Sequence, residues 1–470
     1  MIALTLTQIA EAVGGHLVLG ESGADADAVI EGAAQTDSRE IEPGGIFFAR
    51  IGESSDGHLY VDQAVERGAA ALVVQHEVAA PVPQIIVEDA TEALGELART
   101  VVHRVLTAGN LTIVGITGSN GKTTTKNLVA AMAERLGATV ASQKSFNNEV
   151  GGPITMLGVA DDTRTLVAEM GASAEGEIAR LTAMAPPHIG IVLAVGNAHS
   201  GVFGGIEATA RTKAEMVRDL PADAVAVLNR DDPRVAAMAE QTAARVRWFG
   251  RSDSADVWAD DIEVGAAGTR FTLHAEGREL PVVFAVLGEH HVSNALAAAA
   301  TGLELGLTLE QVVETLEAAT IAAPGRMQPL GGRDGITIVN DSYNASPESM
   351  EAGLKTLAQI SKPGGRTIAV LGEMLELGEM SGEAHDRVGV LAVRLRISQL
   401  VIVGAGARRM HISAINEGAW TEGESVYFES QDQAYDYLLQ TLRPNDTVLV
   451  KSSLGAGLLT LGDRLGEAFA

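Results

Sequence analysis

The chain has 470 residues, a length that predicts two or three domains rather than one. It carries 34 Lys and Arg against 61 Asp and Glu, and this formal net charge of −27 argues against a nucleic-acid partner or an anchor on anionic lipid. The sequence has no cysteine, which excludes disulfides, thiolate metal sites and a cysteine nucleophile. A site for an anionic ligand would therefore have to be a local basic or amide-rich pocket.

The N-terminal residues lack the pattern of a targeting signal. No Lys or Arg precedes their apolar residues, and no apolar run in the sequence approaches the length of a membrane span. We therefore expect no membrane insertion and a cytoplasmic location. The spacing of Leu6, Ile9, Ala10 and Val13 predicts a short amphipathic helix, with Thr7 as its N-cap.

Three blocks follow one another along the chain, at residues 1–108, 109–322 and 323–470. The first contains strand-like runs at 69–74 and 84–87 and a helical pattern from 90 to 106. Pro324-Gly325 marks a linker before the third block.

The second and third blocks both alternate strands with helices, which predicts mostly parallel sheets covered on both faces and hence an α/β protein. A more polar stretch, 248–281, has the pattern of antiparallel hairpins. The predicted strands are 111–116, 164–169, 188–195 and 224–229 in the second block, and 336–340, 367–371, 399–403 and 447–451 in the third; helices are predicted at 122–136 and 292–305.

A glycine-rich segment after the first strand of the second block has the features of a phosphate-binding loop. Glycines let backbone N–H groups face phosphate oxygens, and the N-terminus of the next helix adds partial positive charge. Lys122 could reach the β- and γ-phosphates, and the Thr123 hydroxyl could bind Mg²⁺. The segment departs from the strict pattern because Ile116 replaces a glycine. Its residues are Gly118, Ser119, Asn120, Gly121, Lys122, Thr123 and Thr124.

Other polar residues follow predicted strands, at the edge where an open parallel sheet binds ligands. Glu169 ends one strand and could hold Mg²⁺ near the phosphates. His199 follows another strand and could be a metal ligand or a structural histidine, whereas Lys213 alone would read as a surface lysine. Asp231 and Asp232 could face a nucleotide or cap a helix, and the pattern favours neither.

Taken together, these motifs resemble the Mur ligases, the ATP-dependent amide ligases that build the peptide of peptidoglycan. The resemblance covers essentially the whole chain in order. It implies an N-terminal UDP-substrate-binding α/β domain, a central ATPase-like parallel-sheet domain with a phosphate loop, and a C-terminal Rossmann-like domain. The segments that carry it are the phosphate loop, Glu169, the 197–199 segment, Lys213, 288–295, 324–328 and 340–347.

The resemblance implies roles for individual residues around ATP and Mg²⁺. Lys122 and the loop amides would hold the phosphates, while Thr123, Glu169 and His199 would bind Mg²⁺. Lys213 would be carbamylated, which turns a cation into an anionic metal ligand. The residues implied to contact the rest of the nucleotide are Asn294, at the adenine, and Arg326, Asp341, Tyr343 and Asn344, from the linker and the third domain.

The first block narrows the resemblance to a branch within the family. The segments 36–39 and 56–58 resemble a uridine-binding domain, which implies Ser38 as a substrate contact, and Asn147 and Asn148 match a segment that meets the UDP-sugar. This branch adds D-alanyl-D-alanine to UDP-N-acetylmuramoyl tripeptide through an acyl phosphate. The resemblance also implies a monomer, with the third domain closing over ATP about a hinge near Pro324.

Three alternatives remain open from the sequence. One is another family member that adds a single amino acid, although the chain has no Asp-Asn-Pro-Arg segment of the kind used for diaminopimelate. Another is a folylpolyglutamate-synthase-like ligase, and the last is a nucleotide-binding regulator or transport ATPase. Two positions depart from the family: His291 replaces an Asn, and Leu454 stands where a basic residue is usual.

Overall fold

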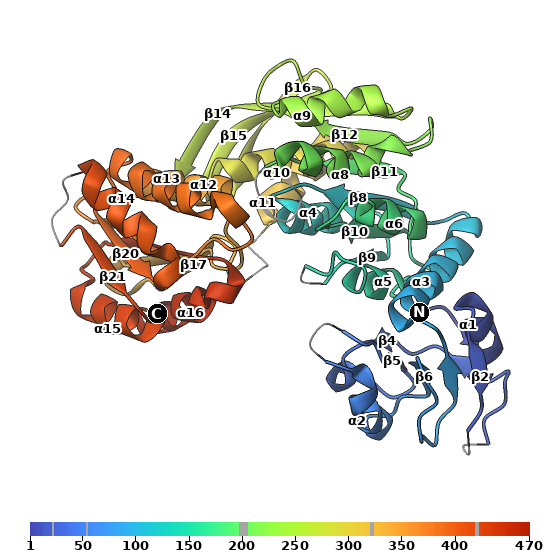
Figure 1. Ribbon diagram of the computed structural model, residues 1–470. Helices are drawn as coiled ribbons and strands as arrows, with labels where there is room; N and C mark the ends of the chain where they lie inside the picture. The colour runs from blue at the N-terminus through green and yellow to red at the C-terminus, as the bar shows by residue number, and fades with distance from the viewer. Residues whose placement is uncertain (21–22, 53–54, 144, 197–204, 320–323, 419–422) are drawn as a thin grey trace.

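The computed structural model describes residues 1–470 except 21–22, 53–54, 144, 197–204, 320–323 and 419–422. In the described part, three sheets of five, nine and six strands follow one another along the chain, with a small two-stranded sheet near the N-terminus. Figure 1 shows the nine-stranded sheet and its helices between the N-terminal and C-terminal parts of the molecule. The mixed α/β architecture with largely parallel sheets confirms the predicted fold class.

The N-terminal part is built on the five-stranded sheet, in the order β2-β7-β6-β5-β4. Helix α3 begins at an N-cap, Asp89, whose carboxylate accepts the N–H groups of Thr91 and Glu92. This helix packs on α1, α5 and α6, so it joins the N-terminal part to the central part. The elements are β1 (Leu4–Thr5), α1 (Leu6–Ala12), β2 (His16–Val18), β3 (Val29–Ile30), β4 (Ala34–Gln35), β5 (Ile46–Phe48), α2 (Val61–Glu66), β6 (Ala71–Val74), β7 (Gln84–Ile86) and α3 (Ala90–Thr107).

The N-cap of α1 differs from the prediction. Thr5 caps the helix, because its side chain accepts the N–H of Gln8 while the Gln8 side chain accepts the N–H of Thr5. Thr7 instead donates its hydroxyl to the carbonyl of Ala26. The prediction of Thr7 was wrong because it placed the N-cap two residues too late and missed the reciprocal pairing of Thr5 with Gln8.

The central part is a nine-stranded sheet, in the order β16-β15-β14-β13-β12-β11-β8-β10-β9. Strands β8 to β14 pair in parallel, and β14, β15 and β16 pair antiparallel, as expected for the polar stretch. The elements are β8 (Thr112–Thr117), α4 (Lys122–Glu134), β9 (Thr139–Ala141), α5 (Gly151–Met156), β10 (Thr165–Glu169), α6 (Glu177–Met184), β11 (Ile189–Val192), α8 (Ile206–Arg218), β12 (Val225–Asn229), α9 (Pro233–Ala237), β13 (Arg245–Gly250), β14 (Val257–Gly265), β15 (Gly268–Ala275), β16 (Arg278–Phe284), α10 (His290–Glu304) and α11 (Leu309–Ala318).

The alanines of α10 explain how closely the central helices approach one another. The residues from Ala295 to Ala300 are fully buried, and α10 packs against α4, α11 and the strands β13 and β14. Small side chains bring the helix axis close to the sheet and to α4. The first turn of α10 therefore lies beside the N-terminus of α4.

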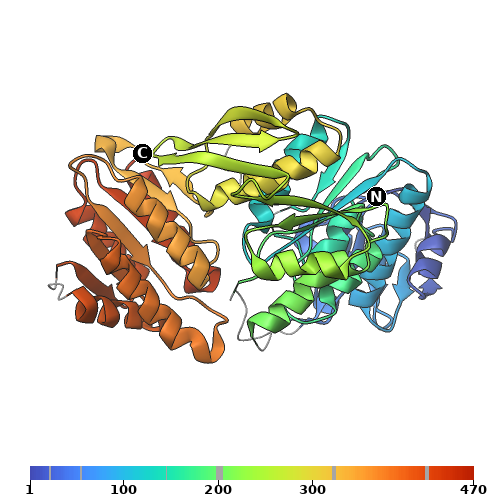
Figure 2. The ribbon, with the colours of Figure 1, turned by 90° about the horizontal axis from the view of Figure 1, so that it is seen from above.

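The C-terminal part is a six-stranded sheet, in the order β17-β18-β22-β19-β20-β21, in which only the pairing of β17 with β18 is antiparallel. Figure 2 shows this part beside the long strands of the central sheet, and β14 contacts α12. The elements are β17 (Gln328–Leu330), β18 (Thr337–Asn340), α12 (Pro347–Gln359), β19 (Thr367–Leu371), α13 (Ser381–Arg394), β20 (Gln399–Val403), α14 (Arg408–Gly418), β21 (Ser425–Phe428), α15 (Gln431–Thr441), β22 (Thr447–Lys451) and α16 (Leu458–Ala468). None of the helices in the described ranges is long and apolar enough to cross a membrane.

One buried ion pair closes the amino ends of β19 and β22. The Arg366 guanidinium contacts both carboxylate oxygens of Asp446, at 2.6 and 3.2 Å, and Asp446 is only 1% exposed. The same carboxylate accepts the N–H groups of Arg366 and Arg443. Removing the charge of Asp446 would leave the half-buried guanidinium of Arg366 without its counter-ion.

We predict that Asp446→Asn lowers the free energy of unfolding of the C-terminal part by about 3 kcal/mol. Denaturant unfolding followed by hydrogen exchange would measure the loss. Asp432→Asn is the matched control, since Asp432 also pairs with an arginine, Arg464, but in solvent. Equal effects of the two substitutions would contradict the prediction.

Candidate active site

The loop between β8 and α4 has the geometry of a phosphate cradle. Gly121 has φ +85°, and a Cβ atom there would lie 2.2 Å from Oδ1 of Asn294, so both the backbone and the close approach of α10 require glycine. Ser119 bonds the loop to the segment after β11, donating its hydroxyl to the carbonyl of Gly196 and accepting the N–H of Gly196. The loop leads directly into α4, whose first-turn N–H groups have no acceptor within the helix. Backbone N–H groups and the helix dipole therefore favour an anion here.

Glu169 lies beside this loop because β10 pairs in parallel with β8 and ends at the same edge of the sheet. The Thr123 hydroxyl donates to Oε2 of Glu169 at 3.0 Å, and the Asn147 amide donates to Oε1 at 2.7 Å. Glu169 is 2% exposed, so these hydrogen bonds take the place of water around its carboxylate. The structure thus brings the two predicted oxygen ligands, Thr123 and Glu169, into contact.

Lysines and one arginine surround the same edge of the sheet. Burial lowers the pKa of Lys122 and of Lys126, and the charge of Arg326 lowers both further, while Glu169 opposes the shift. Lys122 folds back on the loop and donates to the carbonyl of Gly118 at 2.8 Å. This concentration of buried cations in a chain of net charge −27 is a local anion site.

Lys213 is the most altered of these lysines. It lies on α8, is 3% exposed, and has its pKa lowered to about 7, first by burial and then by the charge of Lys122. Glu215 and Glu177 offset part of the shift. A large fraction of the Lys213 side chain is therefore the uncharged amine near neutral pH, which is unlike the surface lysine suggested by its local sequence.

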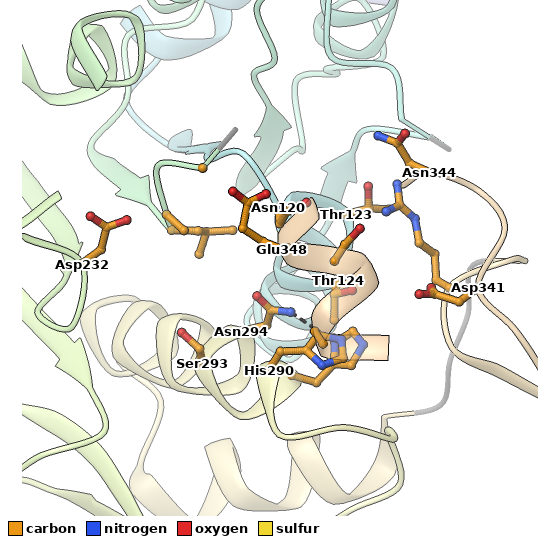
Figure 3. A pocket seen from close by; sticks show the side chains of 18 of the residues that line it. Asn120, Thr123, Thr124, Asp232, His290, Ser293, Asn294, Asp341, Asn344 and Glu348 are labelled. Carbon is orange, nitrogen blue, oxygen red and sulfur yellow. Dashed lines mark hydrogen bonds between the residues drawn. The ribbon is translucent and has the colours of Figure 1, made fainter. Parts of the chain in front are cut away.

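Two cavities meet at the phosphate loop. The first, of about 410 Å³, runs from the loop between α10 and the C-terminal part, and the second, of about 380 Å³, covers Glu169 and Lys213. Asn120, Gly121, Thr123, Arg326 and Asn344 line both. Figure 3 shows side chains of the loop, of α10 and of the C-terminal part converging on the first cavity.

The C-terminal part contributes directly to both cavities. The Arg326 guanidinium stacks on the ring of Tyr343, 4.5 Å from its centre. Ser346 donates its hydroxyl to Oδ1 of Asn120 at 3.3 Å, which links the third block to the phosphate loop. A ligand that fills both cavities would therefore contact residues more than 200 positions apart in the sequence.

Most of the described residues predicted from the sequence lie together around the two cavities, and Ser38 does not. Ser38 is buried in the N-terminal part, where its hydroxyl donates to Gln63, and it lines neither cavity. His199 lies outside the described residues. Those in the first cavity are Asn120, Gly121, Thr123, Thr124, Asn294, Arg326, Asp341 and Asn344; those in the second are Gly118, Ser119, Asn120, Gly121, Lys122, Thr123, Asn147, Asn148, Glu169, Lys213, Arg326, Tyr343 and Asn344.

The two histidines at the start of α10 differ in exposure, because His291 is 6% exposed whereas His290 is exposed beside the first cavity. Desolvation by the surrounding protein lowers the pKa of His290 to about 4 and that of His291 well below its usual value. Nδ1 of His291 is 3.1 Å from the Asn294 amide nitrogen, so His291 keeps a hydrogen bond at a position where the sequence suggested its loss. The amide donates, and the ring nitrogen accepts.

The structure settles the role of the two aspartates after β12. Asp232 caps α9 and accepts the N–H of Val195, while Asp231 accepts the backbone N–H of Arg251, the residue after β13. The helix-cap interpretation of Asp232 is therefore confirmed, although its side chain also lines the first cavity. Sequence reasoning overlooked Lys451, which lines the same cavity and ends a buried strand just as Glu169 does.

The fit of this site to Mg²⁺ can be tested on its donor chemistry. Thr123 and Glu169 offer hard oxygen ligands next to a phosphate loop, which suits Mg²⁺. Among the described residues, no cluster of three or more His, Asp or Glu side chains is arranged to hold a metal. Two protein oxygens with phosphate and water are enough for Mg²⁺, so the residues present fit the ion.

Comparison with known proteins agrees with this geometry. The Mur ligase middle domain matches residues 116–302, the glutamate ligase domain of Mur ligases matches 325–454, and the catalytic domain of the Mur ligase family matches 33–101. The UDP-N-acetylmuramoyl-tripeptide–D-alanyl-D-alanine ligase of Mycobacterium tuberculosis H37Rv is 45% identical over 500 aligned positions, which cover 99% of this chain and 98% of the relative.

Solved structures agree over the same length. MurF from Acinetobacter baumannii has a TM-score of 0.87 and 31% identity, with 99% of each chain covered. MurF ligase from Thermotoga maritima in complex with ADP has a TM-score of 0.80 and 26% identity, covering 93% of this chain and 98% of that one. With its full length matched and its phosphate loop, Glu169 and Lys213 gathered at one sheet edge, this chain belongs to the Mur ligase family.

Proposed function

We propose that this chain is an ATP-dependent ligase that joins D-alanyl-D-alanine to UDP-N-acetylmuramoyl tripeptide. The observation that carries the proposal is the pair of cavities meeting at a phosphate loop, in a chain 45% identical over nearly its whole length to a ligase of that name. We further propose that it acts in the cytoplasm, where the UDP-linked precursor is made, and as a monomer.

The two cavities suggest a division of the substrates. The first cavity would take the adenosine, with Asn294 and the neutral histidines of α10 on one side and Asp341 on the other. The second would take the γ-phosphate and the carboxylate end of the tripeptide, because it contains Lys122, Glu169 and Lys213. Asn147 and Asn148 also line this second cavity, consistent with a contact to the UDP-sugar.

The reaction follows from the chemistry of the groups. The carboxylate of the tripeptide attacks the γ-phosphate of ATP, which releases ADP and leaves an acyl phosphate; the amine of D-alanyl-D-alanine then attacks the acyl carbon and phosphate leaves. Lys122, Arg326 and the loop N–H groups would stabilise the transferring phosphoryl group. The two-sided enclosure by the central and C-terminal parts would limit hydrolysis of the acyl phosphate.

Mg²⁺ fits this scheme as the ion that neutralises phosphate charge, with Thr123 and Glu169 as its protein ligands. Carbamylation of Lys213 would add a further anionic oxygen ligand: the uncharged amine attacks CO₂, and one proton is released. The lowered pKa of Lys213 favours carbamylation, because only the unprotonated amine is a nucleophile.

The central test is phosphate release from Mg²⁺-ATP with UDP-N-acetylmuramoyl tripeptide, with and without D-alanyl-D-alanine. We expect release to require both substrates and a UDP-linked pentapeptide to be found by mass spectrometry. Release supported by a single amino acid on the UDP-linked dipeptide would reassign the substrates. Release without any acceptor would reject the ligase function.

We predict that Lys122→Met lowers kcat/KM by at least about 100-fold, because a positioned cation at the transferring phosphoryl group is lost. Steady-state kinetics with ATP as the varied substrate would measure this. Lys355→Met is the matched control, since Lys355 pairs with Glu351 on the surface of α12 and should keep wild-type rates. Similar losses in the two variants would count against the role of Lys122.

A pH effect follows from Lys213. Its amine becomes protonated as the pH falls through about 7, so carbamylation and activity should both decline below that value and recover above it. With ¹³C-labelled bicarbonate, we expect a carbamate signal by ¹³C NMR that Lys213→Arg abolishes. Activity that is insensitive to CO₂ removal, with no such signal, would contradict carbamylation.

A further inference from the structure

Lys451, which ends β22, is a buried cation in the wall of the first cavity. It is 2% exposed, and its ammonium group lies 2.6 Å from Oδ2 of Asp341 and donates to the carbonyl of Asn344 at 3.0 Å. A charge this deep in a protein is stable only when it is paired and hydrogen-bonded. Lys451 and Asp341 therefore form one unit.

The other carboxylate oxygen of Asp341 contacts the linker between the central and C-terminal parts. Oδ1 accepts the N–H of Met327 at 3.0 Å. Met327 has φ +50°, a left-handed conformation that residues other than glycine rarely adopt, and its side chain is buried. The hydrogen bond from Asp341 holds this unusual backbone in place, and the residue before it is Arg326.

The contacts from Lys451 through Asp341 to Met327 end next to Arg326, which lies at the reaction site. It lines both cavities and stacks on Tyr343, and its charge lowers the pKa of Lys122 on the phosphate loop. Arg326 directly precedes Met327, so the φ of Met327 sets how Arg326 is oriented relative to β17, which begins at Gln328. Holding the Met327 amide in place therefore also holds the backbone from which the Arg326 side chain extends.

Backbone hydrogen bonds join β18 to β22 next to the ion pair. Strands β18 and β22 already pair from Thr337 to Asn340, and the N–H of Asp341 donates to the carbonyl of Val450. Apolar side chains of similar volume often replace a buried ion pair without loss of stability. The pair has a more specific consequence here, which is the orientation of the Asp341 carboxylate toward Met327.

We propose that Lys451 is a positioning residue for the ligase reaction, which holds Arg326 at the junction of the two cavities by fixing Asp341 against the Met327 amide. The inference rests on the proposed function, since the phosphates of ATP are the ligand that Arg326 would meet. It differs from a direct role in binding, because the ammonium group of Lys451 is already occupied by Asp341 and Asn344.

A double-mutant cycle on ATP binding tests this route. Wild type, Lys451→Met, Arg326→Ala and the double variant of the full chain are titrated with Mg²⁺-ATP by calorimetry, and the melting temperature of each is recorded. We expect Lys451→Met to weaken ATP about tenfold in the wild-type background and by less than about twofold in the Arg326→Ala background. A residue that acts through Arg326 has nothing left to position once Arg326 is truncated.

Two outcomes would overturn the proposal: an equal loss in both backgrounds, which would mark a general structural effect, or no loss in either. If Lys451→Met does not fold, Lys451→Gln takes its place in the cycle, because the amide keeps a donor for Asp341 but removes the charge. Pentapeptide formation by the wild type is assayed separately. Its failure would reject the proposed substrates, while the cycle would still decide the role of Lys451.

Discussion

Like charges held close together and away from water are the constraint on which the rest of this structure depends. Lys126 and Lys213 are buried and Lys122 is half-buried near the carboxyl edge of the central sheet, with Arg326 close by, and the pKa of each of these three lysines is lowered. Burial and mutual repulsion both disfavour the charged forms. An anion that enters here reverses both effects, since it pairs with the cations and favours their protonated state. Binding of a polyphosphate is thus coupled to the charge state of the site itself.

The parallel sheets explain why these groups meet. Strands β8 and β10 run in register, so the phosphate loop and Glu169 leave the sheet at the same edge. In the C-terminal sheet, β18 and β22 do the same for Asp341 and Lys451. In each sheet, the functional side chains therefore lie at the carboxyl ends of the strands. The site forms where these two sheet edges face each other. Neither sheet contains the whole site.

The sequence was sufficient for local features and for residues at strand ends. Buried apolar runs predicted β19, β20 and β22 with the same bounds that the structure has, because a strand buried on both faces has no competing pattern. Glu169 and the phosphate loop were found from their positions after such strands. The N-cap of α1 was misplaced because a reciprocal side-chain pair, Thr5 with Gln8, is easily overlooked beside a second threonine.

Long-range relations were beyond the sequence. The near-neutral pKa of Lys213 arises from burial and from Lys122, which is 91 positions away in the chain. The local charged pattern of α8 instead suggested a surface residue. Ser38 was assigned from a motif as a contact to the UDP-substrate, which stays a prediction, and its bond to Gln63 in the N-terminal part could not be foreseen from that motif. A motif identifies a residue type at a position, whereas its partners depend on which elements the fold brings together.

The two departures from the family pattern differ in what they change. His291 lines the first cavity and bonds to Asn294, so it remains part of the wall that supports the phosphate loop through Gly121. Leu454 is half exposed at the start of a short helical turn and lines neither cavity. The basic side chain that is usual at that position therefore has no counterpart in the nucleotide site. Lys451, three residues earlier, is buried in that site, and its charge is committed to Asp341. The ammonium group of Lys451 thus fixes the conformation of the linker and does not contact a ligand. Recognition of the phosphates is left to Lys122, Arg326 and the loop amides.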